Sequence, residues 1–183
     1  EAAWEYCKVL LKVADYDNAE KVIDDLLERQ PGKSDYLIVG AKVALHNANY
    51  SQAVTYFGQV FEKDPAGENG DEALQGLAAS LRESGQKEYS LPLYAQLLQR
   101  HPDSRSLIHK LAVDCYELGL TDKARVYYSM LLEFPDVEDR VIFQAAELFD
   151  APGFRQKSSG LWRTYLERHP DYLPFHYKLA VYY

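Results

Sequence analysis

One short segment recurs along the chain and constrains its fold more than any other feature. Each copy has an apolar pair, then polar residues, then a proline. The copies are Leu26–Pro31, Val60–Pro65, Leu97–Pro102, Leu131–Pro135 and Tyr165–Pro170. A segment that recurs at nearly regular intervals along a chain is the signature of a repeat protein, in which each unit packs mainly on its neighbours. The sequence therefore predicts a string of equivalent structural units.

Between successive prolines, apolar residues have the spacing of a helix. Ala53, Phe57 and Val60 lie at i, i+4 and i+7, which places them on one face of a helix that packs against a core. A second helical stretch precedes each such stripe, as at Leu74 and Leu77. Each unit is therefore predicted to be a helix, a turn and a helix.

This pattern resembles the tetratricopeptide repeat, which carries a small residue where its two helices approach closely. That position falls on Cys7, Ala41, Ala78, Ala112, Ala146 and Ala180. The resemblance implies an all-α fold, a right-handed superhelical α-solenoid of tandem helix-turn-helix units. It covers the whole chain as one solenoid, with repeats over 1–32, 34–65, 71–102, 105–136 and 139–170 and the first helix of a sixth over 173–183.

Three local departures from the repeat lead to specific expectations. The register steps by 34 residues except for one step of 37, which predicts a longer loop near Gly67–Gly70. Pro92 falls in the second helix of repeat three, where its ring costs about 3 kcal/mol inside a helix. We therefore expect that helix to begin near Leu91 or to bend there. Pro152 and Gly153 predict a longer or sharper turn in repeat five.

No catalytic or cofactor motif is complete. Gly32–Ser34 could end a phosphate-binding loop, but the glycine that this motif needs is Leu27. Asp15–Asn18 begins like a calcium-binding loop, yet Glu20 replaces its glycine and Leu26 its bidentate glutamate. Asp15–Asn18 is instead predicted to be a helix-start turn. The sequence thus predicts a protein that is not an enzyme and has no cofactor.

The histidines and cysteines do not form a metal site. The five histidines lack the HExxH spacing, and His101 and His169 precede repeat-ending prolines, where a helix C-terminus favours positive charge. Cys7 and Cys115 lie three repeats apart, too far for a disulfide. Two buried free thiols suit a reducing compartment without excluding an oxidising one, so a cytoplasmic and a bacterial periplasmic location both stay open.

The charge balance narrows the class of partner. The chain has 20 Lys and Arg against 28 Asp and Glu, a net charge of −8, which disfavours nucleic acid and anionic membrane surfaces. No apolar stretch reaches the roughly 18 residues that span a bilayer, so direct membrane insertion is not expected. A protein or peptide partner remains.

The resemblance also implies where such a partner would bind, because first helices line the concave groove of this family. The expected groove residues are Trp4, Lys8, Ile38, Lys42, Gln75, His109, Tyr116, Phe143, Glu147 and Tyr177. Lys8, Lys12 and Lys42 predict a basic early groove, and Glu83, Glu117, Glu147 and Asp150 an acidic later one. Against this, Phe143 could simply pack between adjacent first helices. The lysine and asparagine pattern that holds acidic chaperone tails is absent, which disfavours that ligand.

Three functions stay open. The first is a scaffold that binds a partner peptide, helix or loop, in a larger assembly or export protein. The segment "LLxRHPD" looks like bacterial repeat proteins of secretion and cell-envelope assembly, including polysaccharide exporters, by analogy alone. The second is a regulatory or targeting arm of a larger enzyme, and the third a sensor of a small molecule or short peptide.

The last helix bears on the oligomeric state. Its residues leave almost no polar face: Phe175, Tyr177, Leu179, Val181, Tyr182 and Tyr183. We expect the natural protein to continue on both sides, and the chain alone to associate end to end through this helix or to have it frayed.

Overall fold

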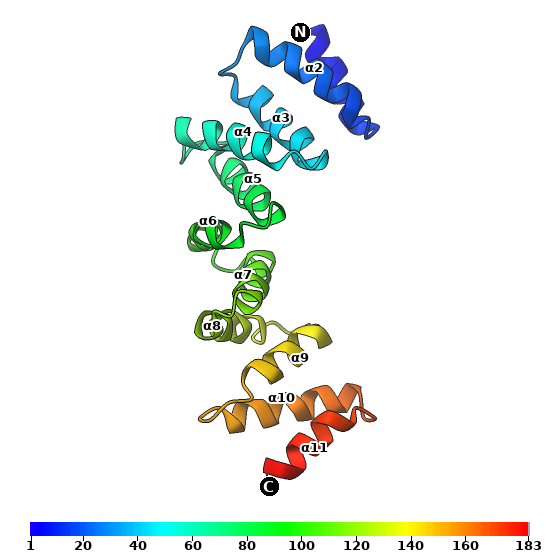
Figure 1. The fold of residues 1–183 in the computed structure, drawn as a ribbon, viewed down its shortest axis with the longest axis vertical. Coiled ribbons are helices and arrows are strands. Elements are labelled where there is room, and N and C mark those ends of the chain that lie inside the picture. Colours follow the sequence, from blue (N-terminus) through cyan, green and yellow to red (C-terminus); the bar gives the residue numbers. More distant parts are fainter. Residues whose placement is uncertain (183) are drawn as a thin grey trace. The chain divides into compact units, whose positions relative to one another are not determined.

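The computed structural model describes residues 1–182; Tyr183, predicted to end the sixth first helix, lies outside the described residues. Over residues 1–182 there are eleven helices and no strand, which confirms the predicted all-α class (Figure 1). The chain divides into two compact units, Glu1–His101 with six helices and a second unit that begins at Pro102. We describe each by itself, as the N-terminal and the C-terminal unit.

The N-terminal unit contains three helix pairs. They are α1 (Ala2–Lys12) with α2 (Tyr16–Arg29), α3 (Ser34–His46) with α4 (Tyr50–Lys63), and α5 (Gly70–Glu83) with α6 (Lys87–Arg100). Each helix packs on the next, and α3 also contacts α5. The predicted stripe of Ala53, Phe57 and Val60 is buried on α4, and the small Ala41 and Ala78 are fully buried.

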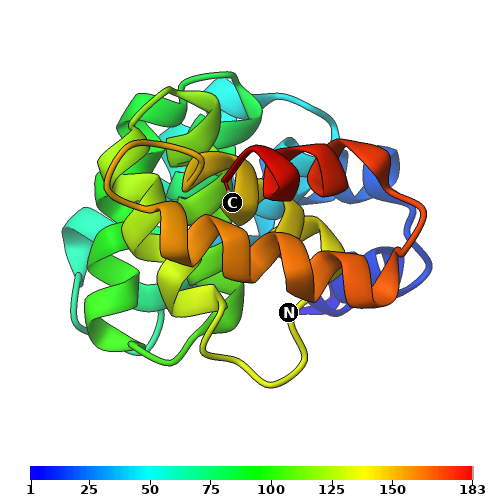
Figure 2. The same cartoon turned by 90° about the horizontal axis from the view of Figure 1, so that it is seen from below.

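The C-terminal unit contains two pairs and one further helix. They are α7 (Arg105–Glu117) with α8 (Thr121–Leu131), α9 (Asp139–Leu148) with α10 (Arg155–Arg168), and α11 (Leu173–Tyr182). Figures 1 and 2 both show α11 beside α10, on which it packs. Ala112 and Ala146 are fully buried, as the repeat pattern predicts, whereas the equivalent Ala180 on α11 is exposed.

Each turn within a pair depends on one left-handed residue. The φ angle is positive at Ala14, Ala48, Gly85, Gly119 and Gly153 (58°, 57°, 83°, 68° and 91°). This conformation reverses the chain at the end of the first helix and costs nothing sterically for glycine, but costs energy for alanine.

Two of these turns are followed by a side-chain cap on the next helix. Asp15 accepts a hydrogen bond from the backbone N–H of Asn18, and Asn49 accepts one from that of Gln52. The helix-start interpretation of Asp15–Asn18 is thereby confirmed.

The loop expectations are confirmed and one expectation for Pro92 is wrong. Residues 64–69 form the longer loop between α4 and α5, and residues 149–154 the longer turn of repeat five. Helix α6 begins at Lys87 rather than near Leu91, so it includes Pro92. Pro92 lies in the second turn of α6, where it removes one backbone hydrogen bond while the buried Tyr94 and Leu97 hold the helix on its neighbours.

A polar contact joins the two ends of repeat three. The Asp71 carboxylate, in the first turn of α5, accepts hydrogen bonds from Arg100 and from His101 Nε2 (2.6 Å for the latter), at the end of α6. Arg100 Nη1 also donates to the carbonyl of Pro65 (3.2 Å). We call this arrangement the Asp–Arg–His clasp. Because the hydrogen bonds from Arg100 and His101 stabilise the carboxylate, they lower the pKa of Asp71.

Repeat five contains the same clasp. The Asp139 carboxylate accepts from Arg168 Nη1 (2.6 Å) and His169 Nε2 (2.8 Å), and these bonds lower its pKa. Arg168 Nη1 also donates to the carbonyl of Val137 (2.9 Å). His101 and His169 thus join helix ends within their repeats.

Repeat four lacks the clasp, although it lies between two repeats that have it. A step of 34 residues puts Arg105 in place of the aspartate, Phe134 in place of the arginine and Pro135 in place of the histidine. Helix α8 ends earlier, at Leu131. The Arg105 guanidinium instead lies 5.6 Å from the centroid of the Phe134 ring and donates to the carbonyl of Asp136.

We predict that Gly119→Ala lowers the free energy of unfolding by about 1 kcal/mol, because alanine is strained at positive φ. A Cβ at Gly119 would meet no atom within 4 Å, so the cost is one of backbone conformation alone. The reverse change, Ala48→Gly, should raise stability by about 0.5 kcal/mol after the larger unfolded-state entropy of glycine is included. Urea unfolding followed by circular dichroism measures both, and a Gly119→Ala protein as stable as the wild type would contradict the prediction.

We predict that Asp139→Asn removes part of the acid sensitivity of the fold. A carboxyl whose pKa is lowered by folding stabilises the fold above its ordinary pKa of 3.8, and this stabilisation is lost as pH falls through the folded-state pKa. Urea unfolding from neutral pH to below 3.8 should show a shallower loss of stability in Asp139→Asn than in the wild type. Asp171→Asn, at an exposed carboxylate without an ion pair in the described chain, is the control. Equal slopes in all three proteins would refute the role of the clasp.

Candidate partner-binding surfaces

Six of the ten expected groove residues occupy the same position in successive repeats, and each lies on the first helix of its repeat; we call these six residues the ladder. Trp4, Ile38 and Gln75 are on α1, α3 and α5 of the N-terminal unit. His109, Phe143 and Tyr177 are on α7, α9 and α11 of the C-terminal unit. Their exposure to solvent differs strongly from one residue to the next.

In the N-terminal unit, the two large apolar residues of the ladder are engaged by the fold. Ile38 is only 6% exposed and belongs to the hydrophobic core, so the expectation that it faces a ligand is wrong. Helix α3 packs on α2, α4 and α5. Trp4 is half-buried, and its ring centroid lies 4.9 Å from that of Tyr36 on α3. Gln75 is exposed.

Two of the three lysines expected to make the early groove basic, Lys8 and Lys42, are paired with carboxylates, which reduces the positive charge expected there. Lys8 Nζ lies 2.7 Å from a Glu5 carboxylate oxygen and over the Trp4 ring. Lys42 Nζ lies 2.5 Å from a Glu72 oxygen, which joins α3 to α5. Both pairs remain exposed to water, where such contacts contribute little stability.

In the C-terminal unit, α7 presents an aromatic side chain to solvent. Tyr116 is 40% exposed and meets the Tyr128 ring edge-on, with centroids 6.3 Å apart. Burial raises the pKa of Tyr128 to about 12, and its hydroxyl donates to Gln144 Oε1. The buried, neutral Tyr128 thus supports Tyr116 from below. His109, about two helical turns before Tyr116, is half-buried.

Phe143 is part of an aromatic cluster and not a free anchor. Its ring centroid lies 5.3 Å from that of Phe175, 5.6 Å from Tyr165 and 5.8 Å from Tyr172. These residues come from α10, α11 and the loop that joins them. The packing interpretation of Phe143 is the one the structure supports, and the expectation of an exposed ladder residue is corrected here.

The acidic residues near the C-terminus are also engaged. Lys178 Nζ, on α11, lies 2.7 Å from Glu147 and 2.8 Å from Asp150. Burial would raise the pKa of Asp150, but hydrogen bonds from Lys178 and Tyr182 outweigh it and leave that pKa lowered. Lys178 therefore balances much of the negative charge expected at this end of the groove.

Tyr177 is the large aromatic ladder residue that stays free of the core. It is 74% exposed, and Leu173 and Val181, four residues to either side, are 75% and 66% exposed. We call Leu173, Tyr177 and Val181 the α11 stripe. A second exposed row lies on α1 and at its C-terminal end: Tyr6, Val9 and Val13. The list of expected groove residues contains only Tyr177 from these two rows. It does not identify either row as a continuous apolar surface, although the helical spacing of both rows can be read from the sequence.

The described part of the chain was also compared with what a metal site, a membrane-spanning helix or a reactive thiol requires. Over residues 1–182 there is no group of three or more His, Cys, Asp or Glu side chains that could hold a metal ion. No helix in this range has the length and apolar character needed to cross a membrane. Cys7 and Cys115 are buried and free, and burial raises the pKa of both thiols, which keeps them protonated.

Comparison with known proteins places these surfaces on a recognised fold. A family model described as tetratricopeptide repeat matches residues 72–104. No curated protein matches the sequence.

Several solved structures share the fold at low sequence identity. YrrB, a TPR protein with an unusual peptide-binding site, is 15% identical over 95% of this chain and 88% of its own, with a TM-score of 0.73. MamA from Desulfovibrio magneticus RS-1 is 14% identical over 93% and 96%, with a TM-score of 0.74. A tetratricopeptide repeat protein from Parabacteroides merdae is 16% identical over 100% and 72%, with a TM-score of 0.73. The chain thus contains a tetratricopeptide repeat at residues 72–104 and has the fold of tetratricopeptide-repeat solenoids.

Proposed function

We propose that the chain is a non-enzymatic scaffold that binds a peptide, helix or loop of a partner protein on its first-helix surfaces. The observation that carries this proposal is the α11 stripe, in which three large apolar side chains are mostly exposed in one row. A contiguous exposed apolar row is typical of a surface that a partner covers, and tyrosine is enriched among binding hot spots. Tyr177 is therefore the residue we expect to anchor the partner.

A second exposed aromatic residue supports the same role in this unit. Tyr116 on α7 presents an apolar ring with a polar hydroxyl, a combination suited to an interface that is part wet and part dry. His109 on the same helix adds a hydrogen-bonding ring. In the N-terminal unit, the half-buried Trp4 and the exposed Gln75 are the remaining candidates from the ladder, with the paired Lys8 and Lys42 beside them.

The comparisons support binding by analogy of fold. YrrB is described as having a peptide-binding site, and we extend peptide binding to this chain as part of the proposal. The resemblance of the repeat-ending segments to bacterial secretion and envelope proteins further suggests a setting. We propose that the scaffold works within a larger assembly or export protein.

We predict that Tyr177→Ala weakens the binding of a selected peptide by roughly thirtyfold, the equivalent of about 2 kcal/mol for a hot spot. Peptides would be selected by display against the immobilised chain and their affinities measured by calorimetry. Tyr89→Ala is the matched control, because Tyr89 is 65% exposed but lies on α6, a second helix. If both variants bind as the wild type does, the α11 surface is not the binding site.

The α11 stripe also supports a proposal about self-association. An exposed apolar row at the last described helix can be covered by a second copy of the chain, which would join copies end to end. Partner binding and self-association would then compete for Leu173, Tyr177 and Val181.

We predict that the average mass of the chain in sedimentation velocity rises with concentration, and that the double variant Leu173→Asp, Val181→Asp stays monomeric. The two aspartates place charge in the apolar contact, where its desolvation is costly. Val126→Asp is the control, since Val126 is also exposed but lies on α8. A wild-type chain that is monomeric at every concentration would exclude the association.

A further inference from the structure

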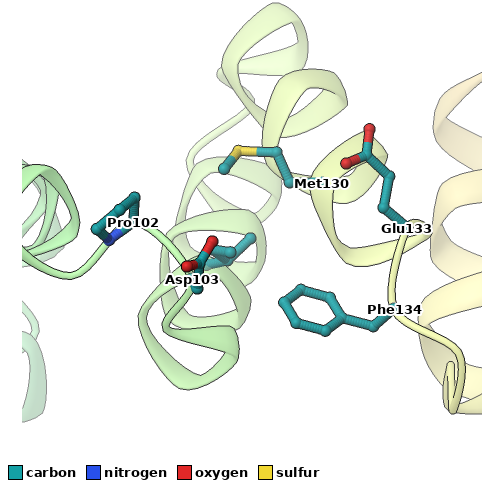
Figure 3. Close-up of a pocket in the computed structure, with 6 residues that line it drawn as sticks. Pro102, Asp103, Met130, Glu133 and Phe134 are labelled. Carbon is teal, nitrogen blue, oxygen red and sulfur yellow. The ribbon is translucent and has the colours of Figure 1, made fainter.

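A cavity lies at one end of repeat four, where α8 stops early. Its volume is about 220 Å³ and its lining residues are Pro102, Asp103, Ile108, Met130, Glu133 and Phe134 (Figure 3). Pockets for whole small molecules usually measure roughly 300 to 1,000 Å³. This cavity is instead of a size to take one amino-acid side chain. It belongs wholly to the C-terminal unit and lies outside the surface proposed above.

The lining combines an apolar wall with carboxylates. Ile108 is buried, and Figure 3 shows the Phe134 ring directed toward Asp103, with Met130 and Glu133 above them in this view. Such a lining suits a side chain with an apolar stem and a cationic head.

The two carboxylates are available for a partner. Neither Asp103 nor Glu133 has a side-chain hydrogen bond or an ion pair within residues 1–182. The neighbouring cations make their hydrogen bonds to other groups. Arg105 donates to the carbonyl of Asp136 and lies 4.0 Å from Glu138. Lys157, which interacts electrostatically with Glu133, donates its hydrogen bond to Ser129 Oγ (2.6 Å).

The neighbouring repeats indicate which cation this place accepts. A step of 34 residues aligns Phe134 with Arg168 and Asp103 with Val137. In repeat five the Arg168 guanidinium binds the Val137 carbonyl, and in repeat three Arg100 binds the Pro65 carbonyl in the same way. Phe134 thus stands where repeat five has an arginine, and Asp103 stands where repeat five has the residue whose carbonyl accepts from that arginine.

We propose that the cavity binds one arginine side chain of a partner protein. This arginine supplies in repeat four, from another chain, the cation that Arg100 and Arg168 supply within their own repeats. Its guanidinium pairs with Asp103 and Glu133, and its methylene groups contact Met130 and Phe134. Arginine suits this site better than lysine because its planar fork can serve two carboxylates at once.

The chain carries a built-in reporter for the test. Met130 is the single methionine of the sequence and it lines the cavity. A ¹³C-methyl label on methionine therefore gives one signal from this sequence in an NMR spectrum. The probe is the blocked tripeptide acetyl-Ala-Arg-Ala-amide, and the comparison probe has citrulline, the uncharged counterpart of arginine, in its place.

We expect a saturable shift of the Met130 signal with the arginine peptide, with a dissociation constant in the millimolar range. The citrulline peptide should bind about tenfold more weakly, and so should the arginine peptide to the double variant Asp103→Asn, Glu133→Gln, since two partly exposed charge pairs are lost. Tyr177→Ala should leave the arginine response unchanged, which separates this site from the α11 surface.

A second double variant tests the repeat equivalence. Arg105→Asp with Phe134→Arg rebuilds within repeat four the aspartate and arginine of repeats three and five. With its helix content verified by circular dichroism, it should no longer respond to the arginine peptide. The proposal is overturned if the Met130 signal does not shift, if the arginine and citrulline peptides bind equally, or if Asp103→Asn, Glu133→Gln binds as the wild type does.

Discussion

The close approach of neighbouring helices at small, buried residues is the contact on which the rest of the structure depends. Cys7, Ala41, Ala112 and Ala146 are fully buried, because a larger side chain there would push two helices apart. At Gly76 even a Cβ atom would come within 2.3 Å of the Phe57 ring. Large side chains such as Phe57 and Trp162 fill the space around these points of close approach. The repeat therefore requires small residues at some positions and large residues at others.

This dependence explains why so much of the fold could be predicted from the sequence. Small residues, apolar stripes and prolines recur at a fixed step, and together they specify helix pairs, the extra loop at 64–69 and the lengthened turn at 149–154. Pro92 alone predicts that α6 begins near Leu91 or bends there, and the first of these alternatives is wrong because α6 begins at Lys87. One missing hydrogen bond costs less than the packing of Tyr94 and Leu97 provides, so the helix runs through the proline.

The binding surfaces were less predictable. A repeat position tells which face of a helix a residue lies on, but not whether side chains from neighbouring helices cover that face. Ile38 became core and Phe143 joined an aromatic cluster because residues from other helices cover them. Charged residues that were expected to give the groove its charge are likewise paired with residues of other helices, as Lys42 is with Glu72 and Glu147 with Lys178. The cavity of repeat four could not be predicted either, because it depends on the early end of α8 and on the absence of a clasp at Phe134.

The left-handed turn residues have a consequence for the order in which the molecule opens. In a linear array, stability is a sum of local terms and nearest-neighbour terms, so a weaker link sets where fluctuations begin. The first two turns use Ala14 and Ala48, whereas the later three use glycine. The turns that join α1 to α2 and α3 to α4 therefore carry a backbone strain that the three later turns do not. Native-state hydrogen exchange should find the most frequent partial unfolding among the amides of these earliest repeats.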